Sequence, residues 1–234
     1  MKVTVVKNVL DANERIAAEN RKLLAESCDI YQEALAIASR LDQARLNLRK
    51  KLMHWLDLLQ KVIDQTRQRV IMGKKLPAYQ KIVSVFETHT DILVKDNRQT
   101  IFGHKVCLAG GASGIITDFT IEKGNPPDSL LAAKMIARQN GIYGRPPRQA
   151  AFDGGFASTA NLKTIKLDGV KDVAFHKKRG LKVSQMVKSA WVFKMLKDFR
   201  AGIEGCISTL KRAFALSRCS WRGEQGFHAY VWTS

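Results

Sequence analysis

Two acidic residues lie in sequence contexts that suit metal-dependent chemistry. Asp153 follows the short apolar run 150–152 and precedes two glycines. Glu204 lies in a stretch with helical periodicity, with Arg200 one turn before it and Lys211 two turns after it. Carboxylates are the ligands that Mg²⁺ and Mn²⁺ prefer, and neighbouring cations attract a phosphodiester backbone. The pattern indicates chemistry on a polyanion, with Asp153 and Glu204 as both the catalytic and the metal-binding candidates.

The helix that would position Glu204 is predicted over residues 199–222. Its polar face holds Arg200, Glu204 and Lys211. Its opposite face is expected to pack on a core and consists of Ile203, Ile207, Leu210 and Phe214. A simpler interpretation is a surface helix with an Arg–Glu pair, worth about 0.3–0.5 kcal/mol. Asp153 has a similar alternative as a residue that begins a turn, so spacing alone leaves both interpretations open.

The R-x3-E-x6-K spacing of Arg200, Glu204 and Lys211 resembles the C-terminal signature of DDE transposases of bacterial insertion sequences. Further stretches resemble the same family and follow one another in the family's order. They are KIVSVFETHTDILVK (81–95), FGHKVCLA (102–109), GIITDFTIEKGNPPDS (114–129), AAFDGGFAS (150–158) and GIEGCISTLKR (202–212). The resemblance covers roughly residues 65 to 234, and several motifs in order are a stronger signal than any one alone.

This resemblance implies metal-dependent cleavage and strand transfer of insertion-sequence DNA ends. Asp153 resembles the family's second acidic residue and Glu204 its third. The family's first acidic residue lies on a first strand ahead of a helical region, and residues 2–6 contain no acid. Asp118 is a poor substitute because its motif resembles the family's third strand. We therefore expect an N-terminally truncated chain without the first carboxylate, which is either an impaired transposase or a non-catalytic DNA-binding remnant or regulator of transposition.

The charge of the chain points to the same class of partner. The net charge is +18 and the pI is near 10, which favours a polyanion such as DNA. Residues 141–234 hold 17 Lys and Arg against 6 Asp and Glu, so the more basic part also carries both acidic candidates. The expected DNA contacts are Arg200, Lys211, Arg212, Arg218, Arg222, Lys177, Lys178 and Arg179.

Composition also excludes some classes of protein. The chain has 45% hydrophobic and 26% charged residues, a balance typical of globular proteins. No run of about 18 apolar residues predicts a membrane span. The four cysteines lack CxxC spacing, which favours reduced thiols. We expect a cytoplasmic, nucleoid-associated protein that binds DNA and no membrane, with a homo-oligomer as an open possibility.

An N-terminal helical region is predicted over residues 1–75, with a boundary at the glycine and proline of 72–79. Residues 12–72 contain neither glycine nor proline, which favours two or three helices, with breaks near 27–29 and 39–42. Residues 2–6 favour a short strand. The helices could contact DNA or a second subunit, form a purely structural bundle, or belong to a coiled-coil or RNA-associated protein.

Residues 76–234 are predicted to form an incomplete catalytic core. From residue 101 the pattern gives strand, strand, helix, strand, helix, strand, helix, starting with a hairpin of 101–109 and 115–122. The later elements are expected at 130–139, 150–155, 161–169, 172–176 and 184–198. This order predicts an α/β fold, a mixed sheet flanked by helices. It matches the ribonuclease-H-like fold of the DDE family from its second strand onward, with the first strand missing.

Overall fold

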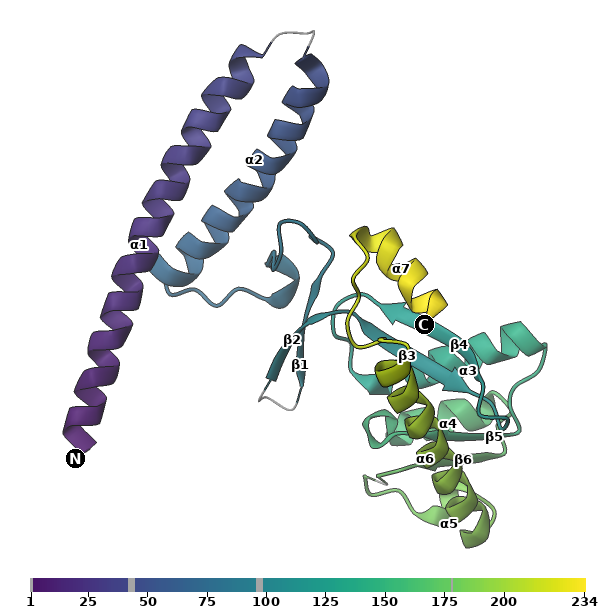
Figure 1. The fold of residues 1–234 in the computed structure, drawn as a ribbon. Coiled ribbons are helices and arrows are strands. Elements are labelled where there is room, and N and C mark those ends of the chain that lie inside the picture. The colour runs from purple at the N-terminus through teal and green to yellow at the C-terminus, as the bar shows by residue number, and fades with distance from the viewer. Residues whose placement is uncertain (1, 42–44, 96–98, 178) are drawn as a thin grey trace. The chain divides into compact units, whose positions relative to one another are not determined.

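The protein is a mixed α/β structure that divides into two compact units. The computed structural model describes residues 2–41, 45–95, 99–177 and 179–234 (Figure 1). One unit comprises residues 1–90 and the other residues 91–234. In the part of the chain that the structure describes, the first unit is helical and the strands lie in the second.

The first unit is a helical hairpin. Helix α1 (Lys2–Arg40) runs antiparallel to α2 (Leu46–Thr66), which continues as the π-helical turn η2 (Arg67–Ile71) (Figure 1). The strand expected at 2–6 is wrong, because these residues extend α1. The break expected near 27–29 is also wrong.

Breaks were expected at two serines of α1, and only the second of them lies near the end of the helix. Ser27 lies within the helix and donates its hydroxyl to the carbonyl of Leu23 at 2.7 Å, so the helix absorbs this polar side chain without a break. Ser39 lies at the expected break near 39–42, which is confirmed because α1 ends at Arg40.

The segment that follows η2 folds back onto α2. Ile82 exchanges two hydrogen bonds with the side chain of Gln65, at 3.0 and 2.9 Å. Phe86 makes an edge contact with Trp55, with ring centroids 5.6 Å apart. These contacts attach residues 77–90 to the helices, and the compact units therefore divide after Thr90, whereas the sequence pattern placed the division after residue 75.

Within its described residues, the second unit contains three pairs of strands. The predicted hairpin is confirmed as the antiparallel pair β3–β4, with Lys105 opposite Glu122. The antiparallel pair β1–β2 was not predicted, and His104 separates β2 from β3 where one strand was expected. The pair β5–β6 is parallel, as the βαβ pattern requires. The strands are β1 (Asp91–Lys95), β2 (Gln99–Gly103), β3 (Lys105–Gly110), β4 (Ile116–Glu122), β5 (Gln149–Phe152) and β6 (Asp172–Phe175).

Helices alternate with the later strands in the predicted order. Ser158 caps α4 by accepting a hydrogen bond from the backbone N–H of Asn161 at 3.0 Å, as its position before the helix predicted. Two short 3-10 turns, η4 (Asp128–Leu130) and η5 (Gly154–Phe156), precede α3 and α4. The helices are α3 (Leu131–Tyr143), α4 (Thr159–Leu167), α5 (Val183–Met186), α6 (Ala190–Ala213) and α7 (Gly223–Thr233).

The two helices predicted at 184–198 and 199–222 are wrong in their bounds. Helix α6 crosses that division without a break and ends earlier, at Ala213. Ala215 adopts a left-handed conformation, φ 55°, and the N–H of Leu216 bonds to the carbonyl of Leu210 at 3.0 Å. This closing turn usually uses glycine, and an alanine at the position gives no sequence signal.

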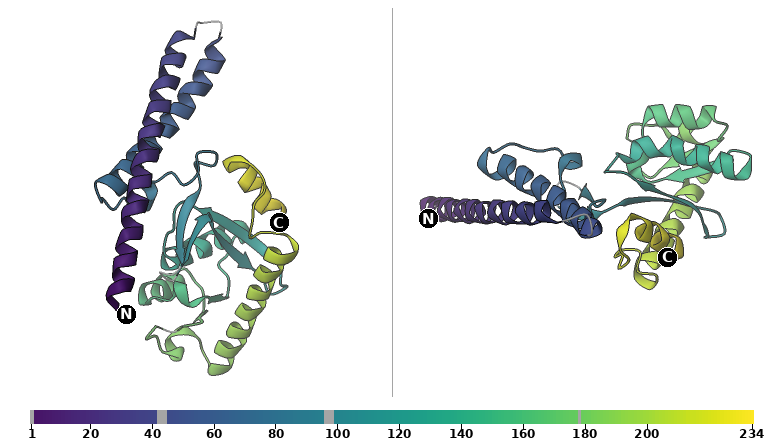
Figure 2. Two further views of the ribbon diagram at one scale, coloured as in Figure 1. Left: turned by 60° about the vertical axis from the view of Figure 1, so that its left-hand side comes forward. Right: turned by 90° about the horizontal axis from the view of Figure 1, so that it is seen from above.

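The main core lies around β5 and β6. All four residues of β6 are buried, and Phe175 is fully enclosed. Helix α4 contributes Ile165 to this core, and α6 contributes Val192 and Leu196. Helices α3 and α4 lie on one side of the strands and α6 on the other (Figure 2). Both β5 and the start of α6 are thereby held by one apolar cluster.

A second, smaller core lies between β3 and α3. It contains Cys107, Leu131 and Met135. Burial, reinforced by the nearby carboxylates of Glu122 and Asp128, raises the pKa of the Cys107 thiol to about 11. Every cysteine lies in the described residues and is free, as predicted.

Candidate functional site

Asp153 lies where β5 ends, at the edge of the main core. Its Oδ1 accepts a hydrogen bond from the backbone N–H of Gly154 at 2.6 Å and so starts the turn η5. A Cβ at Gly154 would lie 2.7 Å from Cβ of Lys177, and a Cβ at Gly155 would collide with the carboxylate of Asp128. Neither glycine has a positive φ. The two glycines are therefore required by the close approach of neighbouring side chains.

Glu204 lies on α6 and reaches the same place from another element. One guanidinium nitrogen, Nη2 of Arg200, donates a short hydrogen bond to Oε1 of Glu204 and a second one, 3.1 Å long, to Oδ1 of Asp153. Because a single nitrogen bonds both oxygens, these oxygens lie no more than about 6 Å apart. The structure thus brings Asp153 and Glu204 together, and Arg200 is the group that joins them.

The three side chains differ in their exposure to solvent. The side chain of Arg200 is only 14% exposed, whereas those of Asp153 and Glu204 are 56% and 55% exposed. Two carboxylates against one guanidinium leave a net negative charge at an open surface. A cation can therefore approach the carboxylates from solvent. The same contacts would also serve a purely structural role, by fastening α6 to the end of β5.

The donor set fits a hard divalent cation only in part. Asp153 and Glu204 supply the oxygen ligands that Mg²⁺ and Mn²⁺ prefer. Among the described residues, no group of three or more His, Cys, Asp or Glu is placed to hold a metal ion. The two carboxylates would thus hold an ion with water completing its shell.

Asp128 lies beside this site and was not predicted there. Its carboxylate abuts Gly155 and pairs with Nζ of Lys105, 2.5 Å away. Lys105 also donates to the carbonyl of Pro126 at 2.7 Å. The contact was not predicted, because nothing local shows that a residue of this turn packs against one that is 27 positions later.

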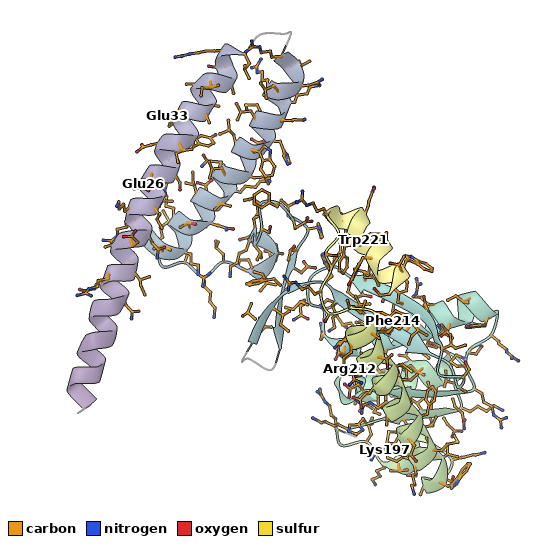
Figure 3. The ribbon with its side chains drawn as sticks, viewed as in Figure 1. Glu26, Glu33, Lys197, Arg212, Phe214 and Trp221 are labelled. Atoms are coloured by element: carbon orange, nitrogen blue, oxygen red, sulfur yellow. The ribbon has the colours of Figure 1, made fainter. Side chains whose placement is uncertain are left out.

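Most of the predicted DNA contacts lie on exposed parts of the second unit. Lys211 and Arg212 occupy the last turn of α6, and Arg218 and Arg222 follow before α7 (Figure 3). All four are exposed. Because their side chains are already at the surface, they can contact a phosphate backbone.

The remaining predicted contacts lie at or near the loop after β6. Lys177 and Arg179 are exposed, and the stem of Lys177 packs on Gly154 beside Asp153. Lys178 lies outside the described residues. Arg200 differs from the rest, because its guanidinium is engaged by Asp153 and Glu204. It is therefore better placed to position the carboxylates than to contact DNA.

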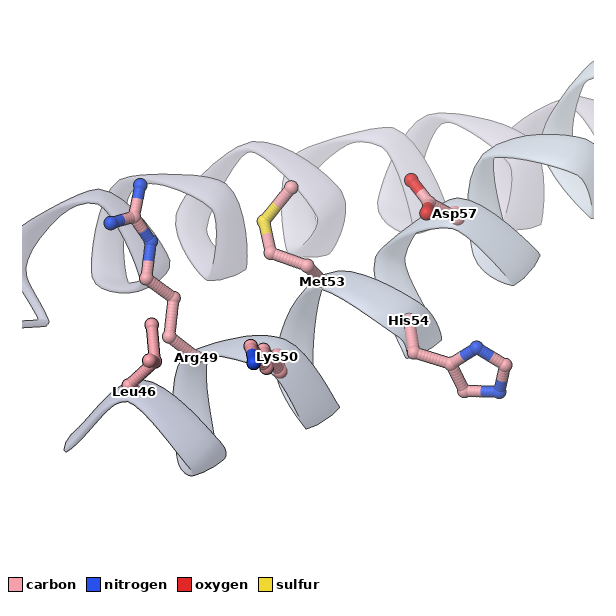
Figure 4. Close-up of a pocket in the computed structure, with 6 residues that line it drawn as sticks. All are labelled: Leu46, Arg49, Lys50, Met53, His54 and Asp57. Atoms are coloured by element: carbon pink, nitrogen blue, oxygen red, sulfur yellow. The ribbon is translucent and has the colours of Figure 1, made fainter.

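A basic hollow that sequence reasoning missed lies on the second unit. It surrounds Asp172, whose carboxylate accepts hydrogen bonds from Gln149 and from the backbone of Lys188. The four cationic residues that line it are Arg148, Lys166, Lys171 and Lys188. Only the basic composition of residues 141–234 hinted at such a surface. Another hollow, along α2, contains neither acidic candidate (Figure 4).

The other buried carboxylates are occupied by structural partners. Asp118 accepts two hydrogen bonds of 2.7 Å from Arg138, which lower the pKa of its carboxyl group. Burial opposes ionisation of Glu122, but hydrogen bonds from Lys134 and Thr120 outweigh it and lower the pKa of Glu122. Both carboxylates fasten α3 to β4, and neither is available to the candidate site.

Comparison with protein-family models, with curated protein sequences and with solved structures gives no significant match. Within the described residues, no helix is long and apolar enough to cross a membrane. A functional conclusion must therefore rest on the residues of the site and their geometry.

Proposed function

We propose that residues 91–234 form the core of a DDE-type transposase with a ribonuclease-H-like fold, and that Asp153 and Glu204 are two of its metal-binding carboxylates. The observation that carries this proposal is the meeting of the two side chains at Arg200. When bound, divalent ions in such a core activate the attacking hydroxyl and stabilise the leaving oxygen of a DNA strand. The order of the five family-like motifs supports the same assignment.

The strand pairing supports the expectation that the first strand of this fold is missing from the described residues. In the described residues β3 pairs only with β4, and β5 pairs only with β6. Each of these two strands therefore keeps one edge of backbone groups without a strand partner. Helix α6 crosses in front of β5 and β6 (Figure 1), and its Ile203 contacts Gly110 at the end of β3. A strand bearing the first carboxylate would join both pairs into one mixed sheet.

A second candidate is a non-catalytic DNA-binding remnant or regulator. The occupation of both carboxylates by Arg200, with no third acid grouped with them in the described residues, favours it. Both candidates require DNA binding through the exposed lysines and arginines that are the predicted DNA contacts. Only the first requires a bound metal ion.

DNA binding is tested by fluorescence anisotropy with a labelled duplex at several salt concentrations. The double substitution Lys211→Ala and Arg212→Ala should weaken binding and reduce the slope of log affinity against log salt by about two. The matched control is Lys194→Ala with Lys197→Ala, which removes the same charge nearer the start of α6 (Figure 3). Equal weakening by the control would show that total charge, and not this surface, governs binding.

Catalysis is tested by Mg²⁺-dependent nicking of supercoiled plasmid DNA. The chain alone should nick no faster than its Asp153→Asn variant, because two carboxylates leave the site incomplete. Nicking that depends on Asp153 would show that the site is complete and that the first carboxylate was mislocated. DNA binding without any metal binding at Asp153 and Glu204 would favour the regulator.

A further inference from the structure

Helix α1 carries a line of apolar side chains that is largely exposed to solvent. Ile16, Leu23, Ile30 and Ile37 are each more than half exposed. The side of α1 that packs on α2 is different and is marked by the buried Ala38. The exposed line spans about 32 Å of helix at a rise of ~1.5 Å per residue.

The spacing of these four residues is seven throughout. In a straight α-helix a seven-residue repeat drifts by about 20° per heptad, so a partner that follows the stripe must wind around α1 with a left-handed twist, as a second helix does in a coiled coil. The repeat therefore indicates a helix as the partner of this stripe.

The residues that flank the stripe on each side of α1 form two columns, and their charges distinguish a parallel from an antiparallel pairing of two helices. One side is acidic and consists of Glu19, Glu26 and Glu33. The other side is neutral and consists of Asn20, Ser27 and Ala34. Glu26 and Glu33 lie on the side of α1 away from α2 (Figure 3).

Two copies of α1 can meet along the stripe in two orientations. In a two-fold antiparallel pair, each acidic column would face the acidic column of the other copy, which is repulsive. In a two-fold parallel pair, each acidic column faces the neutral column, where the side chain of Asn20 can donate a hydrogen bond to a glutamate. The charge pattern therefore selects the parallel arrangement.

We propose that the chain self-associates as a parallel homodimer through α1, with Ile16, Leu23, Ile30 and Ile37 of one copy against the same residues of the other. This goes beyond the proposed catalytic core, because it concerns the helical unit alone and requires neither DNA nor metal. The seam is one column wide, so the association is reversible and depends on protein concentration.

Sedimentation velocity of the full chain over about a hundredfold range of concentration tests this proposal. The mass should rise from 26.2 kDa towards twice that value. The double variant Leu23→Glu with Ile30→Glu should stay monomeric. Its matched control, Ala18→Glu with Ala25→Glu, adds the same charge at other exposed positions of α1 and should still dimerise. Far-UV circular dichroism checks that both variants keep their helices.

The orientation is tested by a charge added to the neutral column. Asn20→Lys should tighten a parallel dimer by about two- to fivefold at low salt, because each lysine then faces a glutamate of the other copy. Weakened or unchanged association would overturn the parallel arrangement. A wild-type chain that is monomeric at every concentration, or a dimer that survives Leu23→Glu with Ile30→Glu, would overturn the proposal itself and leave the stripe to a contact within the chain.

Discussion

The two halves of α6 are built differently although they form one helix. In the first half, Val192 and Leu196 are buried in the main core. In the second half, Ile203 and Ile207 are only half-buried, and Phe214 after the helix is 54% exposed. The apolar side of the first half is thus covered more fully than that of the second half.

The chemistry-bearing side chains lie beyond the well-packed half. Arg200 follows Leu196 by one turn, and Glu204 comes one turn later. Burial in the first half holds the helix against β5 and β6, and this fixes where Glu204 can reach Asp153. A metal-binding carboxylate must remain accessible, so stability and accessibility are provided by successive segments of the same helix.

The largest expected effect is a contrast in stability between these halves. Leu196→Ala should lower the free energy of unfolding by about 2–5 kcal/mol, because it leaves a cavity in the main core. Ile207→Ala should lower it by roughly 1 kcal/mol, since about half of that side chain already contacts water. Urea denaturation of both variants measures the difference. Equal losses would show that the second half is as well packed as the first.

A pair of glycine substitutions contrasts the close packing around Asp153 with the open second half of α6. Gly155→Ala should destabilise the protein by about 1–3 kcal/mol, because the new methyl group collides with Asp128. Gly205→Ala should stabilise it by about 0.5–1 kcal/mol, because it lies inside α6 with open space around it. Thermal denaturation of both variants checks the opposite signs. Stabilisation by Gly155→Ala would contradict the close packing around Asp153.

Acid should lower the free energy of unfolding through Asp172, whose carboxylate bonds to the backbone of Lys188 just before α6. Asp172 is buried, and although burial opposes its ionisation, hydrogen bonds from Gln149 and from the backbone of Lys188 lower the pKa of its carboxyl group. A lowered folded-state pKa contributes stability that is present above the ordinary aspartate pKa of about 3.9 and is lost as the pH falls through the folded value. Unfolding free energies between neutral and acidic pH should show this loss. Asp172→Asn should reduce it, and an unchanged acid dependence would contradict the assignment.

A smaller change is expected when the bridging cation is removed. Arg200→Gln takes a positive charge from between two carboxylates, so Mn²⁺ should bind several-fold more tightly. Isothermal titration calorimetry measures the change, with Lys197→Gln on the same helix as the control. Weaker Mn²⁺ binding would show that Arg200 mainly keeps the carboxylates in place.

Much of the second unit could be predicted because its signals are local. The β3–β4 hairpin, the alternation of helices and strands, and the Ser158 cap follow from neighbouring residues. The end of α6 could not be predicted, because Ala215 adopts a conformation that favours glycine. The pairing of β1 with β2 was not predicted either, since a single strand was expected across His104.

The residue types of the candidate site could be predicted, but the contacts between its side chains could not. The contexts of Asp153 and Glu204 indicated metal-binding carboxylates, and the structure brings them together. That Arg200 would bond both, and that Asp128 would press against Gly155, depends on segments distant in the sequence. Such contacts are properties of the packed fold, which no local spacing encodes.

We propose that Asp153 and Glu204 hold one cation between them. Mn²⁺ affinity, measured by electron paramagnetic resonance, tests it in wild type, Asp153→Asn, Glu204→Gln and the double variant. Asp168→Asn and Asp198→Asn serve as controls, because both aspartates are exposed. Each single variant should lose about tenfold or more in affinity, and the double variant should lose little beyond that, because one shared ion makes the effects non-additive. Affinity that survives both substitutions, or losses that simply add, would contradict a shared cation.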